Sequence, residues 1–427
     1  MATLQEIREM WGSLGMDLEK HDEFLNSFPL VLKDVVLSQP NRPEKMDYFT
    51  TVVKTVHGRR PYELYEYKQK GGKVFGTYCV YVPDEVIYAL GGVTTGLCGG
   101  DQFWVPGGEQ VLPSNTCALI KSSVGSRLDR TSPFCQLADM YIGEATCDGK
   151  KKAWEILSQD VPMHIMDMPQ KKRERDIERF AEEIWELSET VAKVTGHQLE
   201  SGALADNIRL INDKRRALIR LHSTRKAKPA PISGRDALIV TQVAFYDDPA
   251  RFADKANLLS EELEERVARQ QGPYPENTPR LLVTGSPMAL PNWMIHHVAE
   301  TSGAVVVAEE LCTGSRYYEN LVDETGTSLE DQIMALARRY MKTNCACFYE
   351  NQGRIEDILQ MVDDYQVDAV IGYSLQFCGL YTTENYLVQQ ALQEKGIPYL
   401  HIESDYSQKN AEQLRTRIEA LIEMVRG

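Results

Sequence analysis

One succession of predicted strands and helices occurs twice in this chain, and this duplication limits the fold more than any other feature. In the first copy "ADMYIGEATC" (138–147) is followed by a predicted helix and "VPMHIMDMP" (161–169); in the second, "VDAVIGYSLQFC" (367–378) is followed by a helix and "IPYLHIESD" (397–405). Alternating strands and helices are typical of parallel sheets, and self-similar segments indicate a repeat. The sequence predicts an α/β protein with two Rossmann-like parallel-sheet domains, related as an internal repeat, and an added helical region.

Changes in residue pattern along the 427 residues divide the chain into four predicted regions. They are an N-terminal helical region (1–73), a first α/β domain (74–170), a charged helical region (171–277) and a second α/β domain (278–427). No apolar run approaches the ~18 residues of a transmembrane helix. The N-terminus lacks the apolar core of a signal peptide. We therefore expect a cytoplasmic protein that makes no membrane contact.

The cysteines follow the same duplication. A reducing cytoplasm disfavours disulfides, so the nine cysteines of the chain need another explanation. "LCGG" (97–100) matches "LCTG" (311–314), "NTCA" (115–118) matches "TNCA" (343–346), and both repeated strands end in cysteine. The corresponding triads are Cys98, Cys117, Cys147 in the first half and Cys312, Cys345, Cys378 in the second. Ligands bind at the carboxyl ends of parallel strands, and helix N-termini stabilise thiolates, so we expect these thiols to form a site.

Several simpler interpretations compete for these cysteines. A single free cysteine is most often a small buried apolar residue, but six at matching positions argue against that reading for the whole set. Structural zinc sites favour closely spaced cysteine pairs, and the only close pair here is Cys345 and Cys347. A thioredoxin-like C-x-x-C is absent. Widely spaced ligands from two domains favour an iron–sulfur cluster in the cleft between them.

Other chemistry is sparse in the sequence. Neither a P-loop nor a dinucleotide-binding G-x-G-x-x-G occurs, and the net charge of −15 disfavours nucleic acid as a partner. The pair His296–His297 and the lysines 150–152 are interpreted as structural or solvent-facing. Glu309–Glu310, at a predicted strand end, is a weak acid–base candidate. The cysteines therefore remain the main functional signal.

Longer motifs carry a family resemblance. In order, "YCVYVPDEVIYALGGV", "LPSNTCALIKSSVG", "ATCDGKKKAWEIL", "PISGRDAL", "EELCTGSR", "FCGLYTTE" and "IPYLHIESDY" resemble the 2-hydroxyacyl-CoA dehydratase family over roughly residues 74–427. The resemblance implies a [4Fe–4S] cluster bound by three cysteines. The positions that match its ligands are Cys117, Cys147 and Cys378.

The additional cysteines resemble one branch of that family, the double-cubane cluster proteins. The extra residues are Cys79, Cys98, Cys312 and Cys345. An [8Fe–9S] double cubane needs six thiolates, three for each cubane, and the two half-repeat triads supply six. Because "TYC" also ends a predicted strand, Cys79 can take the place of Cys98, and this alternative stays open. Cys135 and Cys347 are less favoured ligands.

The resemblance further implies a homodimer, an ATP-hydrolysing iron–sulfur activator protein and a small-molecule substrate. Three functions follow. The first is a reductase that passes low-potential electrons from a double cubane to a small substrate. The second is a dehydratase subunit acting on a 2-hydroxyacyl-CoA, and the third is an electron store or cluster carrier. Six convergent cysteines favour the first, because three suffice for the second.

Overall fold

Two four-stranded parallel sheets form the centre of the structure, a computed structural model that describes residues 2–407 and 411–426. The first has the order β2-β1-β3-β4 and the second the order β6-β5-β7-β8. The strands are β1 (Lys73–Thr77), β2 (Gly92–Gly96), β3 (Met140–Glu144), β4 (Met163–Met166), β5 (Arg280–Gly285), β6 (Val305–Glu310), β7 (Ala369–Leu375) and β8 (Tyr399–Ser404). The shared order confirms the predicted α/β class with two parallel-sheet domains.

Helices connect the strands within each domain. In the first domain they are α5 (Asp84–Ala89), η2 (Gln102–Trp104), α6 (Val105–Gly108), α7 (Ala118–Leu128), α8 (Pro133–Leu137) and α9 (Asp148–Leu157). In the second they are α14 (Met294–Thr301), α15 (Ser315–Tyr318), α16 (Leu329–Lys342), α17 (Gln352–Asp364), α18 (Gly379–Glu394) and α19 (Ala411–Arg426). Helix α17 has no counterpart among the sequence predictions.

The remaining helices lie outside the two sheets. The N-terminal group is α1 (Leu4–Ser13), α2 (Leu18–Leu32), the π-helix η1 (Lys33–Leu37), α3 (Met46–Lys54) and α4 (Arg59–Gln69). The central group is α10 (Glu174–Thr195), α11 (Ser201–Thr224), α12 (Gly234–Val243) and α13 (Pro249–Ala268). The sequence predicted the charged helices of this group but not α12, whose ten residues are all buried. A helix without a polar face has no amphipathic period to detect.

Strand burial explains why the sheets form where they do. Every residue of β5, β6 and β7 is buried. Near-continuous apolar runs are typical of parallel strands covered on both faces. Helix α9 shows the complementary pattern, because Ala153, Trp154 and Leu157 are buried while Lys151 and Lys152 are exposed. Sequence periodicity therefore identified most of the elements that position the cysteines.

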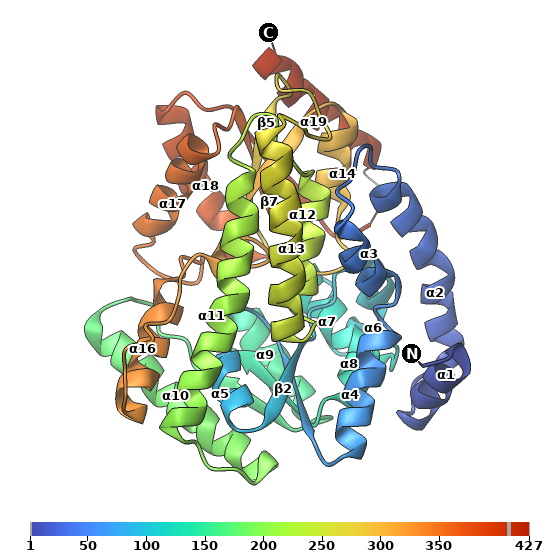
Figure 1. Cartoon of the computed structure of the whole chain (residues 1–427), viewed down its shortest axis with the longest axis vertical. Coiled ribbons are helices and arrows are strands. Elements are labelled where there is room, and N and C mark those ends of the chain that lie inside the picture. Colours follow the sequence, from blue (N-terminus) through green and yellow to red (C-terminus); the bar gives the residue numbers. More distant parts are fainter. Residues whose placement is uncertain (1, 408–410, 427) are drawn as a thin grey trace.

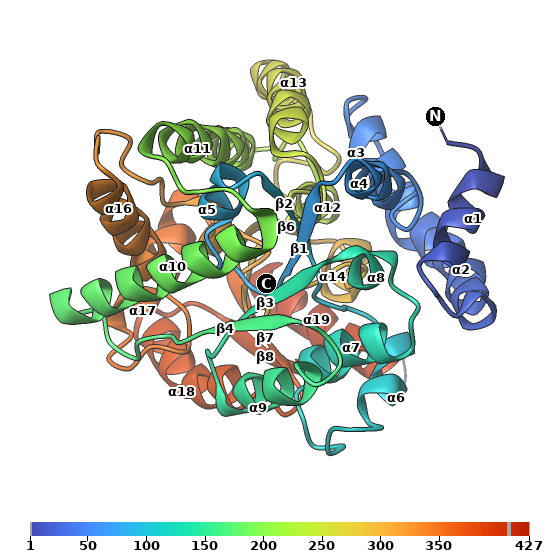
Figure 2. The same cartoon turned by 90° about the horizontal axis from the view of Figure 1, so that it is seen from below.

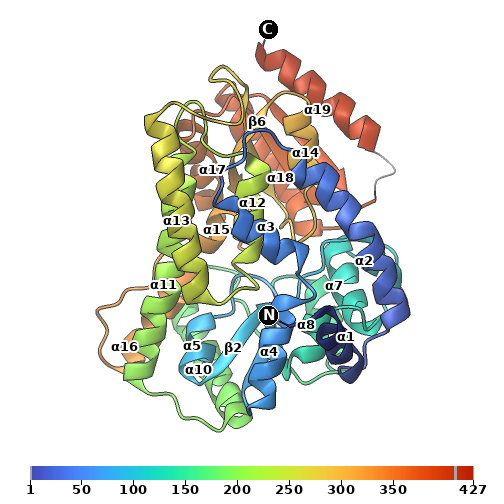
Figure 3. The ribbon, with the colours of Figure 1, turned by 45° about the vertical axis from the view of Figure 1, so that its right-hand side comes forward.

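Helix α11 connects the two α/β domains. Figure 1 shows it running alongside both, with the second domain above and the first below; Figure 2 gives the view from below and Figure 3 an oblique view. Arg215 on α11 donates to Glu85 Oε1 of the first domain at 2.7 Å and to the Tyr340 hydroxyl of the second at 3.0 Å. Arg215 and Glu85 are both buried. This buried network fixes the domains relative to each other, and with them the residues between the sheets.

Among the described residues, no helix combines the length and the apolar composition needed to cross a membrane.

Candidate metal centre

A cavity of about 380 Å³ lies between the two domains, beyond the carboxyl ends of their strands. Six cysteines are among the residues that line it: Cys79, Cys117, Cys147, Cys312, Cys345 and Cys378. The first three belong to the first domain and the others to the second. We call this space the thiol cavity. Six of the seven cysteines singled out by the sequence therefore meet in one place, and Cys98 is the exception.

Three of the six thiols stand at the start of helices. Cys117, Cys147 and Cys378 are the N-cap residues of α7, α9 and α18. The backbone N–H of Lys150 donates to Cys147 Sγ at 3.4 Å. A helix N-terminus carries about half a positive charge and unpaired N–H groups, so three such ends converge on one cavity. This arrangement favours thiolates and an anionic group bound between them.

The other three thiols come from loops. Cys79 follows β1 and Cys312 follows β6, while Cys345 lies between α16 and α17. Cys79 has a φ of 64°, a left-handed conformation that is uncommon outside glycine. Phe377, which precedes Cys378 at the cavity wall, has a φ of 65°. Strained backbone of this kind persists where the surroundings determine it and concentrates at functional sites.

Interactions between thiols link five of the six into two groups. The interaction with Cys117 lowers the pKa of Cys378 to about 7. Cys312 interacts with both Cys345 and Cys79, and these neighbours raise the pKa of Cys312. Hydrogen bonds from Cys312 and Cys347 hold the pKa of Cys345 well below its usual range. Each group contains thiols from both domains, so the contacts do not follow the half-repeat triads that the sequence suggested.

Two buried cations adjoin the loop cysteines. The Arg316 guanidinium, 1% exposed, lies 3.8 Å from Cys312 Sγ and forms an ion pair with Glu310 at 2.8 Å. Lys150 lines the thiol cavity and pairs with Glu144. Burial acts to lower the pKa of Lys150, but the neighbouring Cys79 and Glu144 outweigh it and raise this pKa, so the amine stays protonated. These cations add to the helix N-termini in offsetting negative charge in the cavity.

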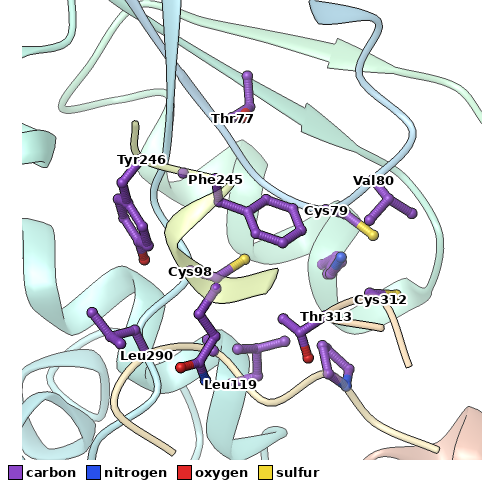
Figure 4. A pocket seen from close by; sticks show the side chains of 15 residues that line it. Thr77, Cys79, Val80, Cys98, Leu119, Phe245, Tyr246, Leu290, Cys312 and Thr313 are labelled. Atoms are coloured by element: carbon purple, nitrogen blue, oxygen red, sulfur yellow. The ribbon is translucent and has the colours of Figure 1, made fainter. Parts of the chain in front are cut away.

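Cys98 lies behind the thiol cavity rather than on its wall. It lines a smaller apolar chamber of about 50 Å³ together with Cys79 and Cys312, and Figure 4 shows the three sulfur atoms around this space. Burial raises the pKa of Cys98 to about 12. The structure therefore places Cys79 on the wall of the thiol cavity with the other five thiols and Cys98 on the adjoining chamber, and this arrangement favours Cys79 as the sixth predicted ligand.

The donor set is chemically suited to an iron–sulfur cluster. Cysteine thiolates are the usual ligands of such clusters, and the cavity presents six thiols with offsetting positive charge. Within the described residues, no three His, Cys, Asp or Glu side chains converge closely enough to hold one metal ion. A multinuclear cluster distributes its cysteine ligands over different irons, so the absence of a mononuclear site does not count against a cluster.

The remaining sequence candidates do not line the thiol cavity. Cys135 is buried and lies 3.5 Å from the Ser126 hydroxyl. Cys347 contacts Cys345 but does not line the cavity. His296 and Arg225 both bind the Glu309 carboxylate, at 3.1 and 2.6 Å.

Glu310 pairs with Arg316 and Arg354, so both acidic residues at this strand end are fixed in ion pairs.

The sequence pattern placed Lys150 among three solvated lysines and gave no signal for Arg316. The spacing of Lys150 from Cys147, three residues along one helix, is the signal that could have identified it.

Comparison with known proteins identifies the family. The model of the 2-hydroxyglutaryl-CoA dehydratase D-component matches residues 79–425, and the chain belongs to this family. A proposed dehydratase subunit of Escherichia coli (strain K12), YjiM, is 36% identical over 366 residues, covering 84% of this chain and 93% of YjiM. The (R)-phenyllactyl-CoA dehydratase beta subunit of Clostridium sporogenes is 21% identical and covers 88% and 98% of the two chains. One of the subunits of benzoyl-CoA reductase from Thauera aromatica is 21% identical and covers 77% and 84%.

The resemblance inferred from the motifs is thereby confirmed. The relatives include subunits of both dehydratases and a reductase, so family membership supports an enzymatic component and does not by itself distinguish the two types of reaction.

Proposed function

We propose that this chain is an iron–sulfur reductase whose six thiols hold an [8Fe–9S] double-cubane cluster. The observation that carries the proposal is the presence of Cys79, Cys117, Cys147, Cys312, Cys345 and Cys378 on one cavity wall. A single [4Fe–4S] cluster bound by three cysteines would leave three thiols of this set without a role. Such a cluster would supply electrons at low potential, since cluster potentials extend to about −700 mV.

The thiol contacts suggest how the ligands divide. Cys117, Cys147 and Cys378 all cap helices, and Cys117 interacts with Cys378. Cys312 contacts Cys79 and Cys345. We therefore assign one cubane to the three N-cap cysteines and the other to the three loop cysteines. Each would be held by both domains, so the network of Arg215 that joins the domains also maintains the spacing of the ligands.

Electrons below the potential of common donors require an energy source. The proposal therefore includes an ATP-hydrolysing iron–sulfur activator protein as partner, a homodimeric assembly and a cytoplasmic location. The substrates would be small molecules that are hard to reduce. Within this scheme the chain's own residues bind the cluster, offset its charge through Arg316, Lys150 and the helix N-termini, and restrict access to it.

A second candidate is a 2-hydroxyacyl-CoA dehydratase subunit with one [4Fe–4S] cluster. The three N-cap cysteines favour it, because they are the positions that match the three-cysteine pattern of the family. The dehydratase subunits among the relatives agree with this reading. Under it, Cys79, Cys312 and Cys345 would remain free thiols.

Iron and acid-labile sulfide, measured on protein purified without oxygen, separate the two candidates. About eight irons per chain support the double cubane and about four support the dehydratase-type cluster. Turnover with the activator and ATP then tests for an enzyme: reduction of a small substrate supports the reductase, and loss of water from a 2-hydroxyacyl-CoA supports the dehydratase. A full cluster that reduces nothing would refute the reductase.

A further inference from the structure

The small apolar chamber behind the thiol cavity has no assigned role in cluster binding. It adjoins the thiol cavity directly, because Cys79, Leu119, Lys150, Pro287 and Cys312 line both. Figure 4 shows Tyr246 and Leu290 on the side away from Cys79 and Cys312, with the ring of Phe245 between Tyr246 and Cys79. Since Cys79 and Cys312 are proposed ligands of one cubane, anything bound in the chamber would lie next to that cubane.

Three polar side chains of the chamber wall already have partners. Gln242 donates to the Met288 carbonyl at 2.8 Å and accepts from Trp293 Nε1 at 2.7 Å. Thr313 Oγ1 accepts from the backbone N–H of Met288 at 3.1 Å. Lys150 is paired with Glu144. An anionic guest would have to compete with Glu144 for Lys150, and a cationic guest would lose its hydration without gaining a partner; either loss is costly.

The size of the space limits the guest further. A volume of about 50 Å³, measured for water-sized probes, accommodates about four non-hydrogen atoms. A second cavity of about 30 Å³ continues from it, and Gly96, Cys98, Tyr246 and Leu290 line both. Phe24, Phe28 and Trp104 line this extension together with the polar residues His57, Ser126 and Ser132. Apolar cavities such as the chamber stay dry and take up uncharged guests.

We propose that the chamber is a binding site for a short uncharged group of about four non-hydrogen atoms, held beside Cys79 and Cys312. This binding site rests on the proposed function, because only a cluster beside Cys79 and Cys312 could react with the bound group, and it adds a substrate class to that function. The group has two sources, a free small molecule or the acyl end of a CoA thioester whose polar part stays outside the chamber. Both would reach the chamber through the thiol cavity, and the chamber accepts either because it recognises shape and absence of charge.

Xenon is a suitable probe because it is uncharged and apolar. Its binding to the cluster-loaded protein can be followed by ¹²⁹Xe NMR. The variant Leu290→Phe fills the chamber and should weaken xenon binding by about tenfold or more, because added volume in a packed interior is poorly accommodated. Val80→Leu is a milder filling variant and should act in the same direction. Leu258→Phe, at a position 42% exposed on α13, is the matched control and should bind xenon as the wild type does.

Equal xenon binding in all four proteins would overturn the proposal. Displacement of xenon by 2-hydroxybutanoyl-CoA but not by CoA alone would assign the site to the acyl end of a thioester. Absence of displacement by either, with sensitivity to Leu290→Phe retained, would assign it to a free small molecule. Xenon binding does not depend on turnover or on the number of irons. A protein that contains no iron but still binds xenon, and loses this binding in Leu290→Phe, would therefore refute the proposed function and still support the chamber as a binding site.

Discussion

The assignment of Cys79 rather than Cys98 as a cluster ligand leads to the sharpest prediction. Cys79 lines the thiol cavity and hydrogen-bonds Cys312, whereas Cys98 lines only the chamber behind it and the cavity beyond. In Cys79→Ala, one cubane loses one of its three thiolates. The iron content should fall from about eight to about four per chain, because the cubane of the N-cap cysteines keeps all its ligands.

The matched variant Cys98→Ala removes a thiol of the same size from the adjacent chamber. It should cost about 1 kcal/mol of stability, as for other small deletions from a core, and it should leave the iron content unchanged. The assay is iron and sulfide per chain on protein purified without oxygen, with the electron paramagnetic resonance spectrum of the reduced protein as a second readout. Thermal unfolding of both variants serves as the control for folding.

The reasoning would fail if Cys98→Ala lost half of the iron while Cys79→Ala kept all of it, because the ligand set would then follow the repeat rather than the cavity. It would also fail if both variants kept about eight irons.

Three further predictions follow from single residues. Cys147→Ala removes the N-cap of α9 and a thiol of the first group, so iron should fall in the same assay; unchanged iron would remove Cys147 from the ligand set. Arg215→Met breaks a buried ion pair and should lower the free energy of unfolding in urea by about 3–5 kcal/mol. Arg216→Met, at a side chain that is 45% exposed, should lower it by at most about 1 kcal/mol. Similar losses in the two variants would contradict the bridging role of Arg215. Burial lowers the pKa of His21 from 6.5 to about 4. The contribution of His21 to the free energy of unfolding is therefore full above pH 6.5 and falls by about 1.4 kcal/mol per pH unit as the pH drops towards 4. In urea titrations His21→Gln should flatten this pH dependence, and an unchanged slope would show that other groups cause it.

Much of the fold follows from local patterns in the sequence. The strands β5 and β7 are apolar runs bounded by glycine or polar residues, and α9 begins where a cysteine and an aspartate precede an amphipathic stretch. The strand predicted to end in "TYC" was right in place, but β1 ends at Thr77, so Tyr78 and Cys79 lie in the loop that follows. Tyr78 and Tyr81 are fully buried there. Because buried loop residues have the same apolar composition as a strand, composition alone could not locate the end of β1.

The site was partly predictable for a related reason. Cys147 and Cys378 each lie three residues beyond the ends of equivalent strands, β3 and β7, and each caps a helix. The local sequence around each cysteine, a strand end followed by a helix start, therefore predicts where these two residues lie. The grouping of thiols across the two domains is a long-range property, since Cys117 meets Cys378 and Cys79 meets Cys312 only when both sheets are packed. No spacing along the chain carries that information.

The two halves of the repeat differ at one cysteine position. Cys98 and Cys312 each lie two residues beyond equivalent strands, β2 and β6, so the duplication pairs them, yet only Cys312 lines the thiol cavity. After Cys98 the chain continues through Gly100, where an added Cβ would lie 2.0 Å from the Ala289 carbonyl oxygen of the second domain. Packing this close seats the loop against the other domain and leaves Cys98 on the chamber side. Its place at the cavity is taken by Cys79, whose left-handed backbone turns the chain directly after β1. A duplicated fold therefore supplies six thiols only because the two halves differ at this interface.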